Sequence, residues 1–258
     1  MADQYNEGNT YEAPYREDNM YFNEYDEPYN SASHSGVVIM DDSAAGVMTG
    51  AFMYMFIALL VTGITAVITA SSPTLIAALF GNSISLLVIF GLEFAIVFAA
   101  SAAMSKNNVV LSAVLFFAYA VINGLTFSVI FLVYTASSIQ QAFFSTAVVF
   151  GLMAFVGKVT KKDLTSIGGI LSVGLLGVIL TSVVNMFIGS SAVDIGISVV
   201  AIFIFLGLTA YDVQKIQNMA SEHSGFNPAV ISLWGAMELY LDFINLFLRI
   251  IRLMGRRK

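Results

Sequence analysis

The chain has 258 residues, of which 58% are hydrophobic and only 11% are charged. Soluble domains average about 45–50% apolar and about 25% charged residues, so this composition excludes an ordinary water-soluble protein. The net charge of −6 argues against nucleic-acid binding, and the lack of cysteine excludes disulfides, zinc–thiolate sites and thiol nucleophiles. The composition therefore predicts an integral membrane protein that has the lipid bilayer as its solvent.

Most of the acidic charge lies at the start of the chain. Residues 1–44 contain ten of the 17 acidic side chains but a single base, Arg16. Residues 1–43 are rich in tyrosine and poor in aliphatic residues, and they show neither helical nor strand periodicity. We therefore predict a disordered acidic tail over residues 1–43. Tyrosine-based docking or phosphorylation is the alternative interpretation of this segment.

Seven apolar stretches follow the tail. A helix needs roughly 20 apolar residues to cross about 30 Å of hydrocarbon. The alternation typical of barrel strands is missing, so residues 44–258 are predicted to form an all-α bundle of seven transmembrane helices. The predicted spans are Gly46–Ala70, Ile84–Met104, Val109–Tyr134, Ala142–Gly157, Leu164–Ile188, Val193–Ala210 and Ala229–Met254.

Lysines in the loops predict the orientation. The loops after the second, fourth and sixth spans carry lysine, whereas the intervening loops carry neither Lys nor Arg. By the positive-inside rule these loops, and the acidic tail with them, are expected to face the cytoplasm. The seventh stretch creates a conflict, because crossing puts the basic residues 256–258 outside while re-entry keeps them inside. Its length favours crossing. The loop lysines are Lys106, Lys158, Lys161, Lys162 and Lys215.

The seventh stretch carries a polar stripe. Six polar residues are spaced 4, 3, 4, 3 and 4 positions apart, which places them on one face of a helix. The other faces are apolar, so this helix should lie inside the bundle and line a polar centre. Asn227-Pro228 predicts its start, with Asn as the cap and Pro in the first turn. The stripe comprises Glu238, Asp242, Asn245, Arg249, Arg252 and Arg256.

Two further acids stand out, because ionisable residues in spanning helices are rare and usually face the bundle interior. Glu93 lies near the middle of the second span, and Asp212 follows the sixth, near the predicted cytoplasmic edge. Asp212 can meet Asp242 only if the seventh helix begins roughly two to three turns outside the membrane. Four glycines of the fifth span should let neighbouring helices approach closely: Gly168, Gly169, Gly174 and Gly177.

Several segments resemble the motifs of a known family. Leu208–Ile216 (LTAYDVQKI) and Leu239–Arg249 (LYLDFINLFLR) look like the two aspartate motifs of the Bax inhibitor-1 family, in its bacterial branch. Thr126–Ser128, Val133–Ala136 and Thr160–Leu164 are similar to it as well. The resemblance extends from about residue 46 to residue 258 and leaves out the tail.

The resemblance implies a seven-helix fold in which the last helix is surrounded by the other six. It also implies pH-sensitive calcium leak, restraint of a membrane-bound AAA protease in bacterial members, and a place in the bacterial cytoplasmic membrane. The family's paired aspartates correspond to Asp212 and Asp242. Some relatives pair an aspartate with a base near the inner end of the second span; here Met104 falls near that place, and Lys106 follows in the loop.

A carboxylate pair is suited to sensing protons. Two carboxylates in a poorly hydrated site cannot both ionise cheaply, so they share a proton and titrate as a unit. We expect a pH-sensitive calcium leak channel without a cofactor, with Asp212 and Asp242 as transient ligands of calcium, which prefers oxygen donors. The predicted sensor and pathway residues are Asp212, Asp242, Glu93 and Glu238, with Arg249, Lys215 and Lys106 as candidate charge partners.

Three alternatives stay open at this point. Asp242 could pair with Arg249 or Lys215 in a purely structural role. The chain could instead be a non-channel modulator that binds and restrains a membrane AAA protease or another membrane partner, or a small-solute transporter, although no clear inverted repeat supports transport. An enzyme is not expected, because no histidine lies in a span and Asp212 lacks the Gly-Leu-Gly-Asp setting of intramembrane aspartate proteases.

Overall fold

The computed structural model describes residues 44–221 and 225–258, so the predicted acidic tail over residues 1–43 lies outside the described residues. Within the described ranges the chain forms eight α-helices, and seven of them are long and apolar enough to cross a membrane. The all-α prediction is therefore confirmed. The helices are α1 (Ala44–Ala70), α2 (Pro73–Phe80), α3 (Ser83–Ser105), α4 (Val109–Val133), α5 (Ala136–Val159), α6 (Thr165–Ile188), α7 (Ser191–Ser221) and α8 (Pro228–Met254).

Side-chain caps fix where several helices begin. Asn82, Asn108, Thr135 and Asn227 each accept a hydrogen bond from a backbone N–H in the first turn of the following helix. Such caps satisfy N–H groups that have no partner inside the helix. The predicted Asn227-Pro228 start of the last helix is confirmed. The short α2, which Ser72 caps, lies where the sequence predicted only a loop.

Two predicted helix boundaries are wrong. Helix α5 begins at Ala136 instead of Ala142, and α7 continues to Ser221 instead of ending at Ala210. The extension of α7 is held by packing, because Val213 and Ile216 are buried in the core beside α8. Asp212 therefore lies within a helix, with more than two turns of α7 still to follow.

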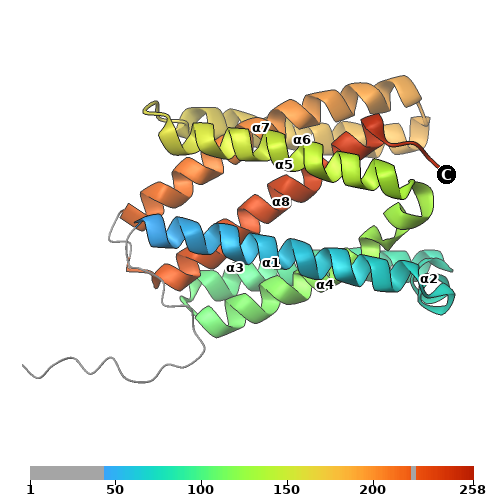
Figure 1. The fold of residues 1–258 in the computed structure, drawn as a ribbon, viewed down its shortest axis with the longest axis horizontal. Coiled ribbons are helices and arrows are strands. Elements are labelled where there is room, and N and C mark those ends of the chain that lie inside the picture. The colour runs from blue at the N-terminus through green and yellow to red at the C-terminus, as the bar shows by residue number, and fades with distance from the viewer. Residues whose placement is uncertain (1–43, 222–224) are drawn as a thin grey trace, which may run out of the picture. The chain divides into compact units, whose positions relative to one another are not determined.

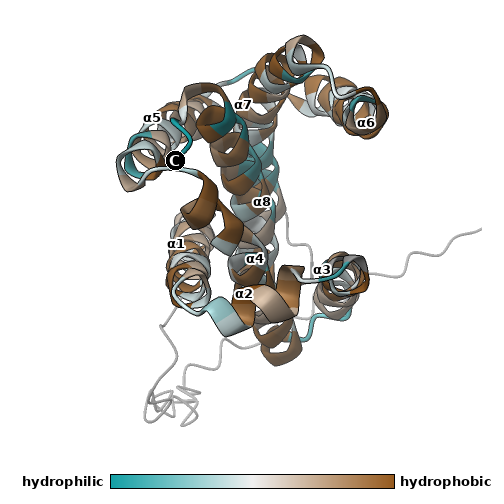
Figure 2. Ribbon diagram, turned by 90° about the vertical axis from the view of Figure 1, so that its right-hand side faces the viewer, coloured by the Kyte–Doolittle hydropathy of each residue, from teal (hydrophilic) through white to brown (hydrophobic). Residues whose placement is uncertain are grey.

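Helix α8 runs obliquely between two groups of helices (Figure 1). Helices α1, α3 and α4 lie on one side of it, and α5, α6 and α7 lie on the other. Helix α8 contacts α1, α3, α4, α5 and α7, whereas α6 packs chiefly against α7. The prediction of a central last helix is confirmed, with α6 as the most peripheral span (Figure 2).

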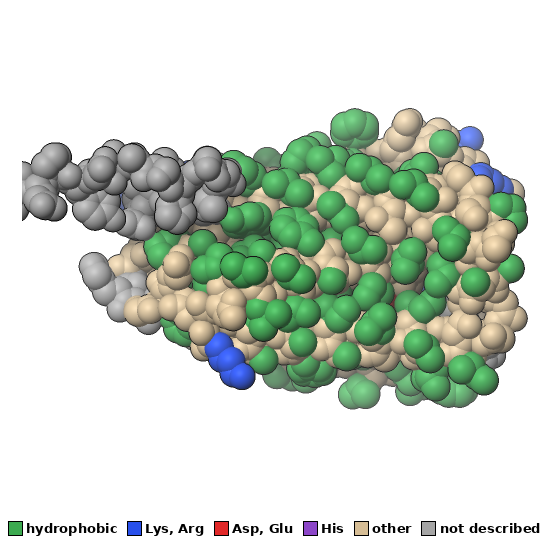
Figure 3. Space-filling view, turned by 90° about the horizontal axis from the view of Figure 1, so that it is seen from below, with side chains coloured by type: hydrophobic (Ala, Val, Ile, Leu, Met, Phe, Trp, Pro, Cys, Tyr) green, Lys and Arg blue, Asp and Glu red, His purple; other side chains and the backbone are tan. Residues whose placement is uncertain are grey.

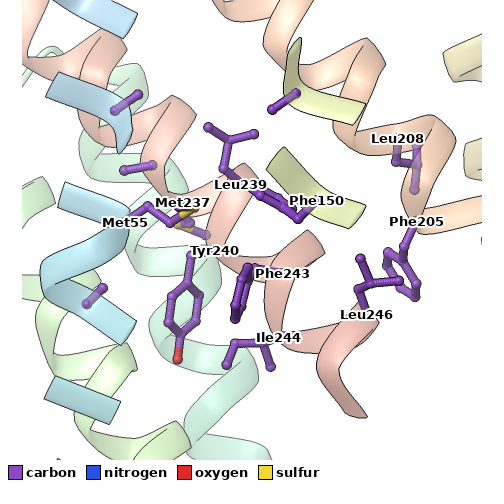
Figure 4. Close-up of a cluster of buried hydrophobic side chains, with 14 of the residues drawn as sticks. Met55, Phe150, Phe205, Leu208, Met237, Leu239, Tyr240, Phe243, Ile244 and Leu246 are labelled. Carbon is purple, nitrogen blue, oxygen red and sulfur yellow. The ribbon is translucent and has the colours of Figure 1, made fainter. Parts of the chain in front are cut away.

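Aromatic and aliphatic side chains of α8 form the centre of the core (Figure 4). The ring of Phe243 stands edge-on to that of Phe150 from α5, with centroids 5.4 Å apart. Tyr240 meets Phe116 from α4 in the same way, at 5.8 Å. These edge-to-face contacts add to the packing of large buried side chains. One helix thus ties both groups of helices together.

The outer surface is apolar. Hydrophobic side chains cover the face shown in Figure 3, and Lys and Arg appear only towards its two ends. Large apolar side chains such as Leu87 and Phe187 are mostly exposed. Exposed apolar area of this extent is stable in lipid and not in water. The chain is therefore a multi-pass membrane protein, as predicted.

Contacts at its two ends show that α8 crosses the whole bundle. At its start, the backbone N–H of Asn227 donates to Asn107 Oδ1 in the α3–α4 turn, at 2.8 Å. Beyond its end, Thr135 N–H donates to the Arg256 carbonyl and Lys258 N–H to that of Val133, both at the α4–α5 turn. Helix α4 separates these two turns by its full length, so re-entry is excluded.

The glycines of α6 differ in what they contact. A Cβ added at Gly168 would lie 2.6 Å from the ring of Tyr211, so this glycine does permit a close approach of α7. A Cβ at Gly174 would meet Ile204 at 3.3 Å. Gly169 and Gly177 have nothing within 4 Å of that position, so the expectation of close packing is wrong for both.

Candidate functional site

Polar residues of α7 and α8 face each other along the line where these antiparallel helices meet. Four of the six residues of the predicted stripe lie on this line, whereas Arg256 follows the end of α8. Figure 2 shows hydrophilic residues of α8 inside the bundle. We call it the α7–α8 seam. It comprises Asp194, Thr209, Asp212 and Lys215 of α7 with Glu238, Asp242, Arg249 and Arg252 of α8.

Asp212 and Asp242 meet near one end of the α7–α8 seam. They are only 9% and 4% exposed, and their carboxyl groups interact directly, with the Thr209 side chain beside them. Oδ2 of Asp242 is buried and has no hydrogen-bond partner among the described residues. Two carboxyl groups in contact away from water are stable when one proton lies between them. The structure thus brings the two predicted aspartates together.

Lys215 and Glu238 form an ion pair one turn from the aspartates. Lys215 Nζ lies 2.5 Å from Glu238 Oε1, which also accepts a hydrogen bond from Trp234 Nε1 at 3.1 Å. The charge of Lys215 still acts on Asp212. Asp242 therefore contacts another carboxyl group, and the base that was its candidate partner pairs with Glu238 instead.

A second ion pair closes the far end of the α7–α8 seam. Arg252 Nε lies 2.5 Å from Asp194 Oδ2 in the first turn of α7. Arg249 is half-buried one turn earlier on α8 and takes part in no ion pair that the described part of the chain contains. It lies two turns from Asp242, too far along the helix for a direct pair.

The seam does not preform a calcium cage. In residues 44–221 and 225–258, no three acidic or histidine side chains are grouped so that they could hold a metal ion. Glu238 Oε1 accepts hydrogen bonds from Lys215 and Trp234, whereas its buried Oε2 has no hydrogen-bond partner among the described residues, so its part in the pathway stays a prediction. Asp212 and Asp242 alone offer too few oxygens for tight calcium binding, so any calcium ligation by the pair is transient.

Glu93 lies apart from the α7–α8 seam. Its Oε1 accepts a hydrogen bond from Thr126 Oγ1 at 2.6 Å, and its charge acts on Tyr119 and Tyr240 across α4 and α8. The structure therefore places Glu93 on the opposite side of α8 from the aspartates, and its role in an ion pathway stays a prediction.

Lys106 takes no part in the site. It follows α3 in an exposed turn and has no ion pair within the part of the chain that the structure describes. Met104, at the place where some relatives carry a base, is buried in the hydrophobic core. A latch between this end of α3 and either aspartate is absent from the described residues.

Comparison with known proteins decides the family. The sequence model described as "Inhibitor of apoptosis-promoting Bax1" matches residues 44–258, which are all seven spans. The chain belongs to the Bax inhibitor-1 family. This Bax inhibitor-1 protein is 38% identical over 214 residues to inner membrane protein YbhL of Escherichia coli K12. The aligned residues make up 82% of this chain and 92% of YbhL.

Relatives from distant bacteria match this Bax inhibitor-1 protein over similar lengths. A protein of Borreliella burgdorferi is 39% identical over 80% of the chain and 90% of its own length. The protein RP147 of Rickettsia prowazekii is 36% identical over 84% and 92% respectively. The resemblance drawn from the two aspartate motifs is therefore confirmed.

The α5–α6 loop, another of the family-like segments, is fixed against α7 near the aspartates. Gln214 Oε1 accepts from Leu164 N–H and its Nε2 donates to the Lys162 carbonyl, both at 2.8 Å. Asp163 in this loop is fully exposed, and hydrogen bonds from the Thr165 side chain and backbone hold the pKa of its carboxyl below the ordinary value. The loop thus braces α7 at a position two residues from Asp212 in this Bax inhibitor-1 protein.

Sequence reasoning missed three residues in or beside the site: Asp194, Thr209 and Trp234. Asp194 is an acid in the first turn of a helix, where acids are common for local reasons. Thr209 and Trp234 lie three and four residues from Asp212 and Glu238, which is the spacing of one helical face. That spacing was the available signal.

Proposed function

We propose that the chain forms a proton-controlled calcium pathway along the α7–α8 seam, with Asp212 and Asp242 as its sensor. The observation that carries this proposal is the direct contact of two buried carboxyl groups from the two helices of one polar seam. While they share a proton, the pair links α7 to α8. Without that proton, two negative charges repel each other in a poorly hydrated site.

The sign of the pH response follows from this chemistry. Lower pH keeps the shared proton and the helices together, and higher pH removes it. Loss of the proton favours entry of water and of a hard cation that neutralises the charge. The ion pairs Lys215–Glu238 and Asp194–Arg252 hold the seam on either side, so separation is expected between these two pairs. Calcium flux should therefore rise with pH.

The name of one relative supports a location. YbhL is an inner membrane protein of Escherichia coli, and this chain matches most of its length. We propose the bacterial cytoplasmic membrane for this chain too, with the lysine-bearing loops and residues 1–43 in the cytoplasm.

Calcium flux from vesicles tests the proposal. The full chain is reconstituted in vesicles loaded with calcium, and flux is measured as a function of pH for the parent, Asp212→Asn and Asp242→Asn. Release of one shared proton allows the parent flux to rise by at most about tenfold per pH unit. Both variants keep a hydrogen-bonding side chain but lose the shared proton, so their profiles should be flat.

Asp163→Asn is the matched control, because it removes a fully exposed carboxyl near the same end of α7. It should keep the parent's pH profile. A profile of Asp242→Asn that superimposes on the parent's would rule out the pair as sensor.

A further inference from the structure

The α6–α7 interface contains a cationic pocket at the end of the bundle opposite the lysine-bearing α5–α6 loop. It has a volume of about 500 Å³ and lies beside the last turns of α8. Gly189 turns the chain here with a φ of 71°, and Asn185 fixes the turn by hydrogen bonds with the backbone of Ser190. We call it the arginine pocket: its lining includes Ser182, Asn185, Ser190, Asp194, Arg249 and Arg252.

The arginine pocket carries an excess positive charge. Arg252 is neutralised by Asp194, but Arg249 has no ion pair within the described ranges. A half-buried guanidinium without an acidic partner is costly in a spanning helix. Arginine offers a planar set of N–H donors that matches a phosphate or carboxylate. An anionic group in this pocket would therefore supply the partner that Arg249 lacks.

An apolar groove adjoins the arginine pocket along the same interface. It has a volume of about 450 Å³. Its lining residues Thr181 and Val193 directly precede the pocket residues Ser182 and Asp194 in the chain. We call it the glycine groove, and its lining includes Gly174, Gly177, Thr181, Val193, Gly196 and Val200. Gly177 and Gly196 leave open space where a side chain would begin.

The glycine groove faces the hydrocarbon region. Helix α6 is the least buried of the seven spans, and the neighbouring Val173, Leu176 and Leu180 are all largely exposed. A groove of this kind is filled by an acyl chain in a bilayer. A free anion would use the pocket alone, whereas a phospholipid has both a charged head and an apolar chain.

We infer that the arginine pocket and the glycine groove together bind one anionic phospholipid, with its phosphate on Arg249 and an acyl chain between α6 and α7. The lipid would join α6 to α7 and α8 at the end where α6 has few protein contacts of its own. This site shares Asp194, Arg249 and Arg252 with the far end of the α7–α8 seam, but lipid binding there does not require the carboxylate pair to titrate.

Native mass spectrometry of the full chain tests this inference. The protein is released from mixed micelles of phosphatidylglycerol and phosphatidylcholine with identical acyl chains, and the bound lipids are counted. The parent should retain phosphatidylglycerol in preference. Arg249→Gln and Gly177→Leu should each reduce the retained phosphatidylglycerol about tenfold, because each removes one half of the site. An excess of inorganic phosphate should not displace the lipid.

Two controls separate this site from general effects. Arg257→Gln removes the same charge at the same end of the bundle but outside the pocket, and Gly169→Leu adds the same side chain to α6 outside the groove. Both should retain lipid as the parent does. Gly177→Leu is expected to fold, since the position is open and leucine favours a helix over glycine.

Three results would each overturn the inference. Equal losses in Arg249→Gln and Arg257→Gln would indicate diffuse attraction of anionic lipid. Equal retention of the two lipids by the parent would show that the pocket does not select an anion. Displacement by inorganic phosphate together with full retention in Gly177→Leu would show a phosphate site without an acyl chain.

Discussion

The two sides of α8 are held by different chemistry. On the side of α1 and α4, the contacts are neutral and complete. Tyr240 is fully buried, and its hydroxyl lies 2.8 Å from that of Thr62, which itself donates to the Ala120 carbonyl at 2.9 Å. Because the Thr62 proton is used in this way, Tyr240 is the donor between the two hydroxyls.

On the side of α7, the contacts depend on charge and on one proton. Asp212 and Asp242 attract each other only while a proton lies between them, and a buried oxygen of Asp242 has no partner among the described residues. The difference suggests that α8 is fixed permanently to one half of the bundle and conditionally to the other. A change of pH would then move α7 relative to α8 and leave α1 and α4 in place.

The largest effect on stability is expected from removing the contacts of α8 with α1 and α4. Tyr240→Ala removes the ring contacts with Phe116 and Tyr119 and the bond to Thr62. The free energy of unfolding should fall by about 3–5 kcal/mol, as for other large buried aromatic residues. Denaturant titration of the purified protein in detergent, followed by circular dichroism, measures this change.

Tyr240→Phe provides the matched control. It keeps the ring and loses only an interhelical hydrogen bond, so the loss should be about 1 kcal/mol. Equal losses for the two variants would contradict the importance of ring packing on this side of α8.

A smaller effect is expected from changing the charges beside the Asp212–Asp242 contact. Lys215→Met removes the ammonium that favours ionised carboxylates nearby, so the rise of calcium flux should move to higher pH by about one unit. Glu238→Gln removes a like charge and should move it to lower pH. The pH profile of flux from loaded vesicles measures both shifts.

Lys158→Met tests whether the lysine must lie beside the aspartates, since Lys158 is an exposed lysine in the last turn of α5. Its profile should match the parent's. Shifts of Lys215→Met and Glu238→Gln in the same direction would contradict control by local charge.

The smallest effect is expected from removing residues 1–43. If the bundle itself conducts calcium, flux and its pH dependence should not change. If the chain is instead a modulator of a membrane protease, the deletion should abolish regulation of that partner in cells. Flux in vesicles and protease activity in cells, measured on the same deletion, distinguish the two functions.

Sequence patterns predicted the spans well because lipid imposes a simple rule on them. They failed at α7, since its last turns are held by contacts of Val213 and Ile216 with the core rather than by apolar composition. They also failed at α2, although Ser72-Pro73 carried the signal of a helix start. The residues that cap α2 were visible in the sequence, whereas the core contacts that extend α7 were not.

The site was predictable in part for similar reasons. The 4-3-4-3-4 spacing showed the polar face of α8, and the aspartate motifs predicted the pairing of Asp212 with Asp242. The partner of Tyr240 could not be predicted, because Thr62 lies 178 positions away and belongs to none of the motifs. The pairing of Lys215 with Glu238 instead of Asp242 depends on the exact rotation of two helices, which spacing alone does not fix.

The central place of α8 has a consequence for how the protein is made. Of the seven spans, as far as the structure describes them, α8 has the lowest mean hydropathy, and it carries charges that each cost about 2.5–3.5 kcal/mol to insert. It also follows the other six along the chain, so they enter the membrane before it during synthesis. The charged residues of α8 are unfavourable in contact with lipid, whereas the other helices offer polar partners for them. Completion of the bundle is thus an assembly step, in which helices already inserted receive the span that is least suited to lipid.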